Sequence, residues 1–335
     1  MKNQIFVSVI VPVYNGGKFL DRCLDAINAS SHKSYELIVV DDCSTDNSAE
    51  MSRQKGATVL HMPQQSGPAA ARNLGSQHAR GDVLFFVDAD VVVRGDSIAR
   101  VAASFENNPG LGAVFGSYDD EPAEKNFLSQ YKNMFHHFVH QQSSAEAETF
   151  WAGCGAIDSR IFAAVGGFDG IRYRRPSIED IELGYRIRQQ GHRILLDKHL
   201  LVKHLKQWRF GSLLRADILC RAVPWTRLIL EREQQVNDLN LKTSDRISAL
   251  LAGLLVASLL ASPFSPKFLY LTAVLAPAIV LLNLDFYRFF LRRKGLIFVA
   301  RTYFMHIFYY LYSGATFALC WGQHFIHGKP LKKVI

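Results

Sequence analysis

The chain of 335 residues lacks several patterns that would assign it to common functional classes. Its five cysteines include no C-x-x-C pair, which argues against a zinc or dithiol redox site and favours reduced thiols. The N-terminal segment has no cleavage site, so we expect a buried strand there rather than a signal peptide. No internal repeat, low-complexity stretch or Gly-rich, Lys-bearing phosphate loop is present. The length allows one large domain with an appendage.

Charge is distributed unevenly along the chain. Residues 1–165 carry 13 Lys and Arg against 19 Asp and Glu, net −6, whereas residues 166–335 carry 25 against 11, net +14. Nucleic acid is one partner that a basic half can bind, but no nucleic-acid motif accompanies it. The basic residues instead flank long apolar runs, which favours an anionic membrane surface. We therefore expect a membrane partner and no nucleic acid, with protein partners unknown.

Two apolar runs, residues 247–264 and 268–284, have 18 and 17 residues, close to the roughly 20 needed to cross a bilayer. The alternative is a buried helical hairpin in a soluble protein. Arginines and lysines on both sides of the pair predict that both ends, and the catalytic domain, lie in the cytoplasm. A third run, residues 302–322, is rich in aromatic residues and suits either a span or an in-plane interfacial helix.

Short apolar runs alternate with helical patterns from residue 5 to about 200, which is typical of an α/β sheet covered on both faces. The expected early strands are 7–13, 37–40, 58–61 and 83–87, and the expected later ones are 111–118, 194–196 and 200–204. The predicted organisation is a catalytic α/β domain over 1–205, an amphipathic or interfacial helical linker over 206–245, and a membrane region over 246–326.

Polar residues follow the first two expected strands. The candidates there for binding a nucleotide are Pro12, Tyr14, Asn15, Asp41 and Asp42. Ligands bind at the carboxyl ends of strands in open α/β sheets, and a carboxylate suits the N–H groups of uracil or guanine. Turn formation and helix capping are the alternative, but they leave two adjacent acids unexplained.

Two further motifs carry charge. Arg72 lies near the start of a helix in Gly67-Pro68-Ala69-Ala70-Ala71-Arg72, where a guanidinium suits a diphosphate or sugar; a surface arginine is the alternative. Asp88 and Asp90 follow a buried strand in Asp-Ala-Asp, and such paired oxygens suit Mg²⁺ or Mn²⁺ bound together with phosphates. Alone, the pair equally suits a turn.

The order of these motifs resembles that of the family 2 glycosyltransferases, over about residues 7–225. The resemblance implies a GT-A fold, a Rossmann-like nucleotide-diphospho-sugar transferase domain. It also implies that Pro12, Tyr14 and Asp42 hold the nucleobase and ribose, that Arg72 contacts the donor, and that Asp88 and Asp90 hold the metal. These residues together predict a site for a UDP- or GDP-linked sugar.

The resemblance directs attention to two later segments. Gly153 and Gly155, in the segment that starts at Trp151, allow close backbone approach to the donor sugar or acceptor, with a simple turn as the alternative. Ser177-x-x-Asp180 is typical of a capping box that positions Asp180 or Glu179 as catalytic base, and in the family the second acid is usually the base.

Other implied contacts lie downstream. His204 corresponds to a family histidine that completes the metal shell, or it is an ordinary histidine at a strand end. The Q-x-x-R-W element of processive synthases is absent, and Arg221-Ala-Val-Pro-Trp225 stands in its place. Trp151, Arg221 and Trp225 are therefore candidate acceptor or diphosphate contacts.

The resulting hypothesis is an inverting, metal-dependent transfer of a sugar to a hydroxyl or phosphate acceptor, lipid-linked or membrane-delivered, in glycolipid or cell-surface polysaccharide biosynthesis. A sugar nucleotidyltransferase and a catalytically silent membrane scaffold are the alternatives. The intact acids at 42, 88, 90 and 180 argue against the scaffold.

Overall fold

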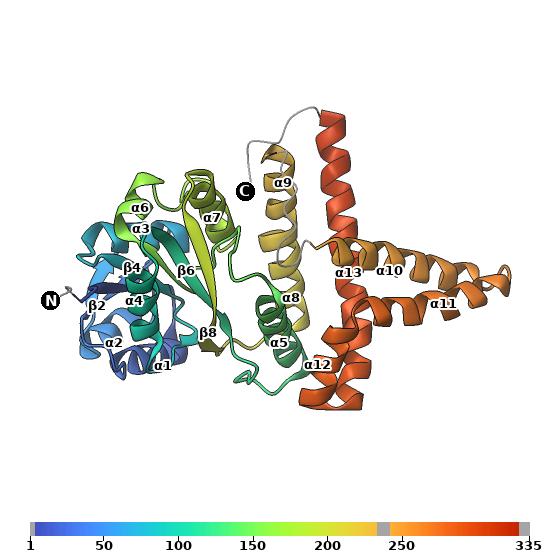
Figure 1. Ribbon diagram of the computed structural model, residues 1–335, viewed down its shortest axis with the longest axis horizontal. Helices are drawn as coiled ribbons and strands as arrows, with labels where there is room; N and C mark the ends of the chain where they lie inside the picture. Colours follow the sequence, from blue (N-terminus) through green and yellow to red (C-terminus); the bar gives the residue numbers. More distant parts are fainter. Residues whose placement is uncertain (1–3, 233–241, 328–335) are drawn as a thin grey trace. The chain divides into compact units, whose positions relative to one another are not determined.

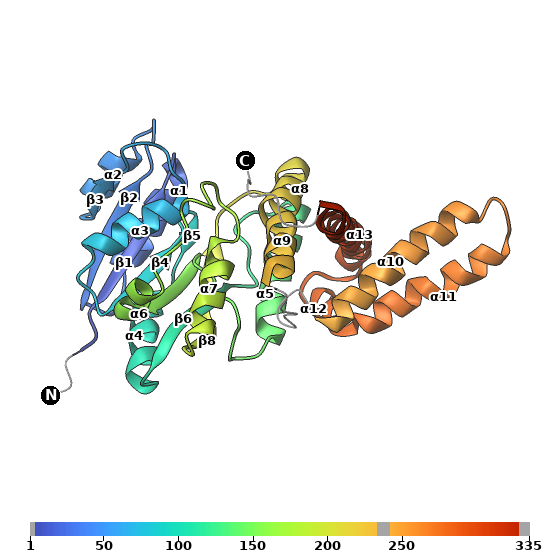
Figure 2. The ribbon, with the colours of Figure 1, turned by 90° about the horizontal axis from the view of Figure 1, so that it is seen from above.

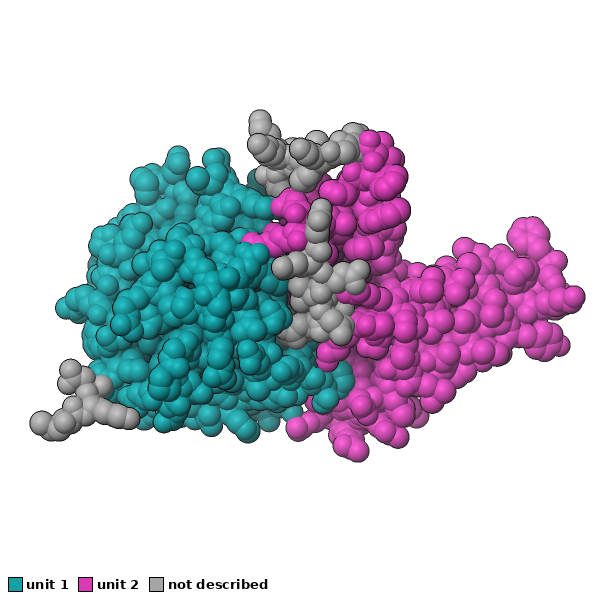
Figure 3. All heavy atoms as spheres, turned by 45° about the horizontal axis from the view of Figure 1, so that its top comes forward, with its two compact units in different colours: residues 1–209, 334 teal, residues 210–333, 335 magenta. Residues whose placement is uncertain are grey.

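The computed structural model describes residues 4–232 and 242–327. The chain separates into two compact units, residues 1–209 and 210–333 (Figure 3). The boundary falls close to residue 205, the predicted end of the catalytic domain. Part of the predicted linker, residues 233–241, and the last basic residues of the chain lie outside the described residues.

The first unit is built on an eight-stranded sheet with the order β3-β2-β1-β4-β7-β6-β8-β5 (Figure 1). The strands are β1 (Val7–Val13), β2 (Tyr35–Asp41), β3 (Thr58–His61), β4 (Val83–Val87), β5 (Val91–Val92), β6 (Leu111–Tyr118), β7 (Cys154–Asp158) and β8 (Arg193–His204). β3, β2, β1 and β4 are parallel, whereas β7 is antiparallel to both β4 and β6. The predicted α/β class is confirmed, with a mixed sheet.

Helices cover both faces of this sheet (Figure 2). They are α1 (Gly17–Asn28), α2 (Ser48–Gln54), α3 (Pro68–His78), α4 (Ser97–Asn107), α5 (Phe127–Gln142), α6 (Ser159–Ala164) and α7 (Glu179–Gln189). Successive side chains of a strand point to opposite faces. Val9 of β1 accordingly packs in one core with α1 and α4, and Ile10 packs in a second core with α3, α6 and α7.

Several local predictions are wrong. The two short strands expected near residues 194 and 200 form one strand, β8, with register irregularities along its pairing with β6. The capping box expected at Ser177 does not form, because Ile178 is the N-cap of α7 and no side chain caps the helix. Ser177 N–H instead donates to Glu179. β5, β7 and α6 have no counterpart among the expected elements.

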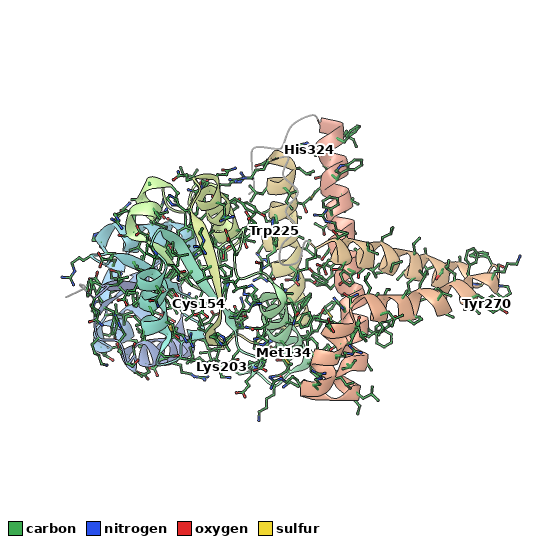
Figure 4. The ribbon with its side chains drawn as sticks, in the orientation of Figure 1. Met134, Cys154, Lys203, Trp225, Tyr270 and His324 are labelled. Carbon is green, nitrogen blue, oxygen red and sulfur yellow. The ribbon has the colours of Figure 1, made fainter. Side chains whose placement is uncertain are left out.

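The second unit is helical in its described residues. Its elements are α8 (Phe210–Asp217), the π-helical turn η1 (Ile218–Ala222), α9 (Val223–Arg232), α10 (Thr243–Ala261), α11 (Lys267–Leu282), α12 (Leu284–Lys294) and α13 (Leu296–His327). α10 and α11 form a hairpin with Tyr270 near its tip (Figure 4). Leu255 of α10, Ile279 of α11 and Tyr310 of α13 share one core.

One described helix, α10, is long and apolar enough to cross a membrane by itself. α11 and α12 meet the same test only together, with a bend of 75° at the break between them. α13 does not meet it, so its described residues give no hydropathy support for the spanning alternative at 302–322. The described residues therefore offer one or two candidate spans.

Candidate functional site

Asn15 joins the loops that follow β1 and β2. Its side-chain oxygen accepts hydrogen bonds from the backbone N–H groups of Thr45 and Asp46, at 2.8 and 3.3 Å. Its own N–H donates to Ser44 Oγ at 2.9 Å, and its φ of +51° is in the left-handed region that Asn tolerates. Asn15 therefore holds the shape of this edge of the sheet, and a direct donor contact stays a prediction.

The two acids at the end of β2 are both buried and bonded. Asp42 accepts hydrogen bonds from the N–H groups of Ser66 and Gly67, at 2.7 and 2.8 Å, which fixes the loop before α3. Asp41 accepts from Ser44 N–H at 3.0 Å and lies 3.2 Å from His61 Nδ1. These contacts explain how two adjacent acids are tolerated, because their carboxylates point to different partners.

Pro12 and Tyr14 border the same loops. Pro12 lies within β1, opposite Val40 of β2, and Tyr14 follows the strand with 48% of its side-chain surface exposed. An exposed aromatic ring beside these loops is available for stacking on a base. Binding of the base and ribose at these residues stays a prediction.

Arg72 connects the acids after β4 to the start of α7. Its guanidinium lies 2.7 Å from Asp88 Oδ1 and 3.0 Å from Glu179 Oε1, although Glu179 is 107 residues away in sequence. Arg72 is 4% exposed, so the alternative of a surface arginine is wrong. A buried guanidinium between two carboxylates fixes both of them in position.

The two acids that begin α7 have different environments. Glu179 is 5% exposed, and its oxygens are bonded to Arg72 and to Ser177 N–H. Asp180 is partly exposed and accepts N–H bonds from Ala152 at 3.1 Å and Ile181 at 2.8 Å. Burial and, next, the charge of Glu179 raise the pKa of Asp180 to about 7, although Arg72 opposes the shift. Asp180 is thus the acid with both access and a suitable pKa for proton transfer near neutral pH.

Asp90 and His204 face each other, with 3.3 Å between Oδ2 and Nε2. The other ring nitrogen, Nδ1, is 2.9 Å from the amide oxygen of Asn133, which only accepts, so Nδ1 carries the proton. Nε2 is then the ring nitrogen that faces the carboxylate, and an imidazole nitrogen and a carboxylate oxygen at this separation suit two ligands of one cation. Tyr118 stacks on the imidazole with ring centroids 4.4 Å apart.

The Asp90 oxygen and the His204 nitrogen are suitable ligand atoms for a divalent cation, but two ligands are fewer than a metal site in a protein usually has. Among residues 4–232 and 242–327, no three His, Cys, Asp or Glu side chains are arranged to hold a metal. Asp88, the third predicted ligand, is bonded to Arg72 instead. Carboxylate oxygen and imidazole nitrogen suit Mn²⁺, and binding by all three residues stays a prediction.

Charge and burial compete at Asp90. Burial raises the pKa of its carboxyl, but the facing His204 and, next, Lys206 lower it, and the pKa lies below its usual value. A carboxylate that stays ionised is the form that a metal requires.

Trp151 occupies the space that its two neighbouring glycines leave. A Cβ on Gly153 would lie 2.6 Å from the Trp151 ring, and a Cβ on Gly155 would lie 2.3 Å from the Trp151 carbonyl oxygen. The ring also contacts Tyr118 and His136, with centroids 4.9 and 4.8 Å apart. The glycines are thus required by aromatic packing, and a donor contact through their backbone stays a prediction.

Arg221 and Trp225 belong to the second unit, in η1 and the first turn of α9 (Figure 4). Four positions apart along consecutive helical turns, they point to similar sides. Their role toward acceptor or diphosphate stays a prediction.

Sequence reasoning missed Asn133, Tyr118 and Lys206. Asn133 and Tyr118 are 71 and 86 positions from His204, so no local pattern connects them to it. Lys206 is two positions after His204, and proximity to that predicted ligand was the available signal.

Part of the chain resembles known proteins. Residues 8–165 match the family described as "Glycosyl transferase family 2". This segment, just under half of the chain, therefore resembles the family 2 glycosyltransferases. The matched segment contains the loops after β1 and β2, Arg72 and both acids after β4; Asp180 and His204 lie beyond it.

Individual relatives match the family 2 segment. "Glycosyltransferase GlyG" of Streptococcus pneumoniae serotype 4 is 32% identical over 126 residues, 36% of this chain and 42% of the relative. "Putative teichuronic acid biosynthesis glycosyltransferase TuaG" of Bacillus subtilis is 32% identical over 99 residues, 28% of this chain and 39% of the relative. The matches thus span less than half the length of these relatives.

A solved structure resembles a larger part of the chain. The mannosyltransferase PcManGT from Pyrobaculum calidifontis, in complex with GDP-Man and Mn²⁺, has a TM-score of 0.54 at 18% identity. The match covers 95% of this chain and 88% of that one. At this identity the likeness establishes the GT-A fold alone.

Proposed function

We propose that this protein transfers a sugar from a UDP- or GDP-linked donor to a hydroxyl or phosphate acceptor, with inversion at the anomeric carbon. The carrying observation is the buried Arg72 bridge between Asp88, on the donor side, and Glu179, which adjoins the partly exposed Asp180. The bridge fixes a donor-side carboxylate relative to a base of raised pKa, as an in-line displacement requires.

In the proposed reaction, Asp180 removes the proton of the acceptor as its oxygen forms a bond to the anomeric carbon. The bond from that carbon to the diphosphate oxygen breaks on the opposite side, and its electron pair stays on the diphosphate. A general base contributes about 10² to 10⁴ in rate. Asp42 and Asn15 support this step by holding the loops at the nucleotide edge.

Asp90, His204 and, after release from Arg72, Asp88 would hold Mg²⁺ or Mn²⁺. When bound, this cation supplies positive charge to the leaving diphosphate. Asn133 orients His204 for this role, and Tyr118 restricts the plane of its ring.

The acceptor side of the proposal rests on the second unit. α10, α11 and the connection between them expose many apolar side chains, among them Leu260 at 71%, Phe264 at 89% and Tyr270 at 77%. Such exposure is costly in water and suits lipid. We infer attachment to the cytoplasmic membrane with the catalytic unit in the cytoplasm, and a lipid-linked or membrane-delivered acceptor.

The test is a donor screen with the full chain, UDP- and GDP-linked hexoses, Mg²⁺ or Mn²⁺, and either extracted membrane lipids or soluble oligosaccharides. Release of UDP or GDP with labelled lipid supports the whole proposal. Transfer to soluble acceptors alone would remove the lipid part. Nucleotide exchange into the sugar donor would favour the nucleotidyltransferase, and no reaction with any donor would favour the scaffold.

A further inference from the structure

The segment that follows β8, residues 205–208, is hydrogen-bonded to Asp90 at one end and to the start of α5 at the other. Leu205 N–H donates to the Asp90 carbonyl oxygen at 2.9 Å. Trp208 N–H donates to Ser129 Oγ at 2.7 Å, and the Trp208 carbonyl accepts from Asn126 at 2.8 Å. The four-residue segment 205–208 is therefore anchored at both ends.

Lys206 lies within this anchored segment and uses Trp208 as a platform. Its ammonium is 4.5 Å from the centroid of the Trp208 ring, a cation–π distance, and Trp208 is only 5% exposed. The lysine itself is exposed. A rigid platform limits where the flexible lysine places its charge, which reduces the entropy lost on binding an anion.

Lys203, near the end of β8, and Lys206, just after it, differ in their partners. Lys203 (Figure 4) is paired with Asp119 at 3.0 Å and Glu121 at 3.8 Å. Lys206 has no ion pair with any described residue, yet its charge acts on Asp90. A cation without a partner acid among the described residues, near a carboxylate that is a predicted metal ligand, is available to a ligand.

We propose that Lys206 binds the diphosphate of the nucleotide sugar, beside the cation site of Asp90 and His204. The inference rests on the proposed function and names one more group in the same site. Lysine binds phosphate as a compact charge. As the anomeric carbon–oxygen bond breaks, its electron pair adds negative charge to the diphosphate, and the Lys206 ammonium stabilises that charge without transferring its proton.

The test compares Lys206→Met with Lys203→Met in the full chain. Calorimetry with Mn²⁺ present measures the affinities for UDP, GDP and the corresponding monophosphates. For the nucleotide that binds, Lys206→Met should weaken the diphosphate roughly tenfold or more while changing the monophosphate less. Lys203→Met, whose charge is already paired, should leave the ratio of the two affinities unchanged.

Two additional measurements separate binding from a structural effect. Lys206→Arg should retain most of the diphosphate affinity, and the affinity of Lys206→Met should depend less on salt than that of the unmodified chain. Trp208→Leu should weaken the diphosphate by a smaller factor, since the charge remains but its platform is lost.

The outcomes distinguish this inference from the proposed function. Sugar transfer by the unmodified chain together with unchanged diphosphate affinity in Lys206→Met overturns the role of Lys206 alone. An equal loss in Lys203→Met also overturns it, because the effect would then be general surface charge. If the unmodified chain binds neither UDP nor GDP, both the role of Lys206 and the proposed function are overturned.

Discussion

The two units treat charge in different ways. In the first, buried carboxylates are bonded to backbone N–H groups, as at Asp42, or to a guanidinium, as at Glu179. In the second, Asp217 and Asp245 accept hydrogen bonds from tyrosines, at 2.7 Å from Tyr312 and 3.3 Å from Tyr310. Strong donors suit acids that must stay ionised in a site, whereas tyrosines suit acids within an aromatic helical core.

Cations show the same contrast. Arg72 is buried between two acids in the first unit. The last turn of α12, by comparison, carries Arg292, Arg293 and Lys294, all on the surface. Cations at the end of an amphipathic helix, beside exposed apolar residues, suit anionic lipid headgroups. The difference is consistent with the proposal that the first unit binds the sugar donor and the second contacts a membrane.

If the first unit is the catalytic one, Asp180→Asn should have the largest effect on activity. The amide keeps the shape of the side chain but does not accept a proton, so kcat should fall by about 10² to 10⁴ while donor binding persists. Steady-state kinetics and calorimetry measure the two quantities. Asp169→Asn, which removes a carboxylate bonded to Arg172 N–H outside the site, is the control. Turnover retained in Asp180→Asn would remove Asp180 as the base.

Breaking the buried charge bridge should be the next largest effect. Arg72→Met leaves Glu179 buried without its cation, which costs about 3–5 kcal/mol of unfolding free energy. Arg80→Met is the matched control, because Arg80 is an exposed partner of Glu36 and its pair contributes about 1 kcal/mol or less. Thermal unfolding of both variants gives the comparison. Equal losses of unfolding free energy in the two variants would show that the buried Arg72 bridge stabilises the fold no more than the exposed Arg80 pair.

The pH dependence of activity should report the raised pKa of Asp180. The carboxyl is protonated below a pKa of about 7 and only its ionised form accepts a proton, so kcat/KM should rise as pH increases through 7. Well below that value, activity should fall about tenfold per pH unit. Glu179 interacts with the same proton, so the limb belongs to the pair. A pH profile that stays flat from pH 5 to 8 contradicts the assignment.

Sequence patterns predicted the parts of the fold that depend on local burial. β1, β4 and β6 have the expected bounds because each is a buried, largely apolar run. β3 also has the expected bounds, although its residues are at most partly buried. β8 was harder, since Asp197 to His199 interrupt its apolar pattern, and the strand pairs with β6 on both sides of this interruption. β7 depends on antiparallel pairing with β4, a contact that no local pattern encodes.

The site shows the same limit. Asp180 and Asp90 were predicted from motifs, because each acid lies directly at the boundary of an element. The partners that determine their behaviour are distant: Arg72 reaches Glu179 across 107 positions, and Asn133 reaches His204 across 71. The prediction of a capping box was wrong because Glu179 bonds to Arg72 and accepts a hydrogen bond from Ser177 N–H, and the helix begins at Glu179.

The smallest expected effects come from two helix-interior glycines, one in each unit. A Cβ on Gly184 of α7 would lie 2.4 Å from Phe150 N, whereas a Cβ on Gly253 of α10 would meet no atom within 4 Å. Gly184→Ala should therefore destabilise by about 1–3 kcal/mol, because the obstacle is backbone. Gly253→Ala should be neutral or stabilising by up to about 1 kcal/mol, from helix propensity. Thermal unfolding in the same detergent measures both. A loss in Gly253→Ala as large as that in Gly184→Ala would mean that α10 packs closely against something beyond its neighbours in the chain.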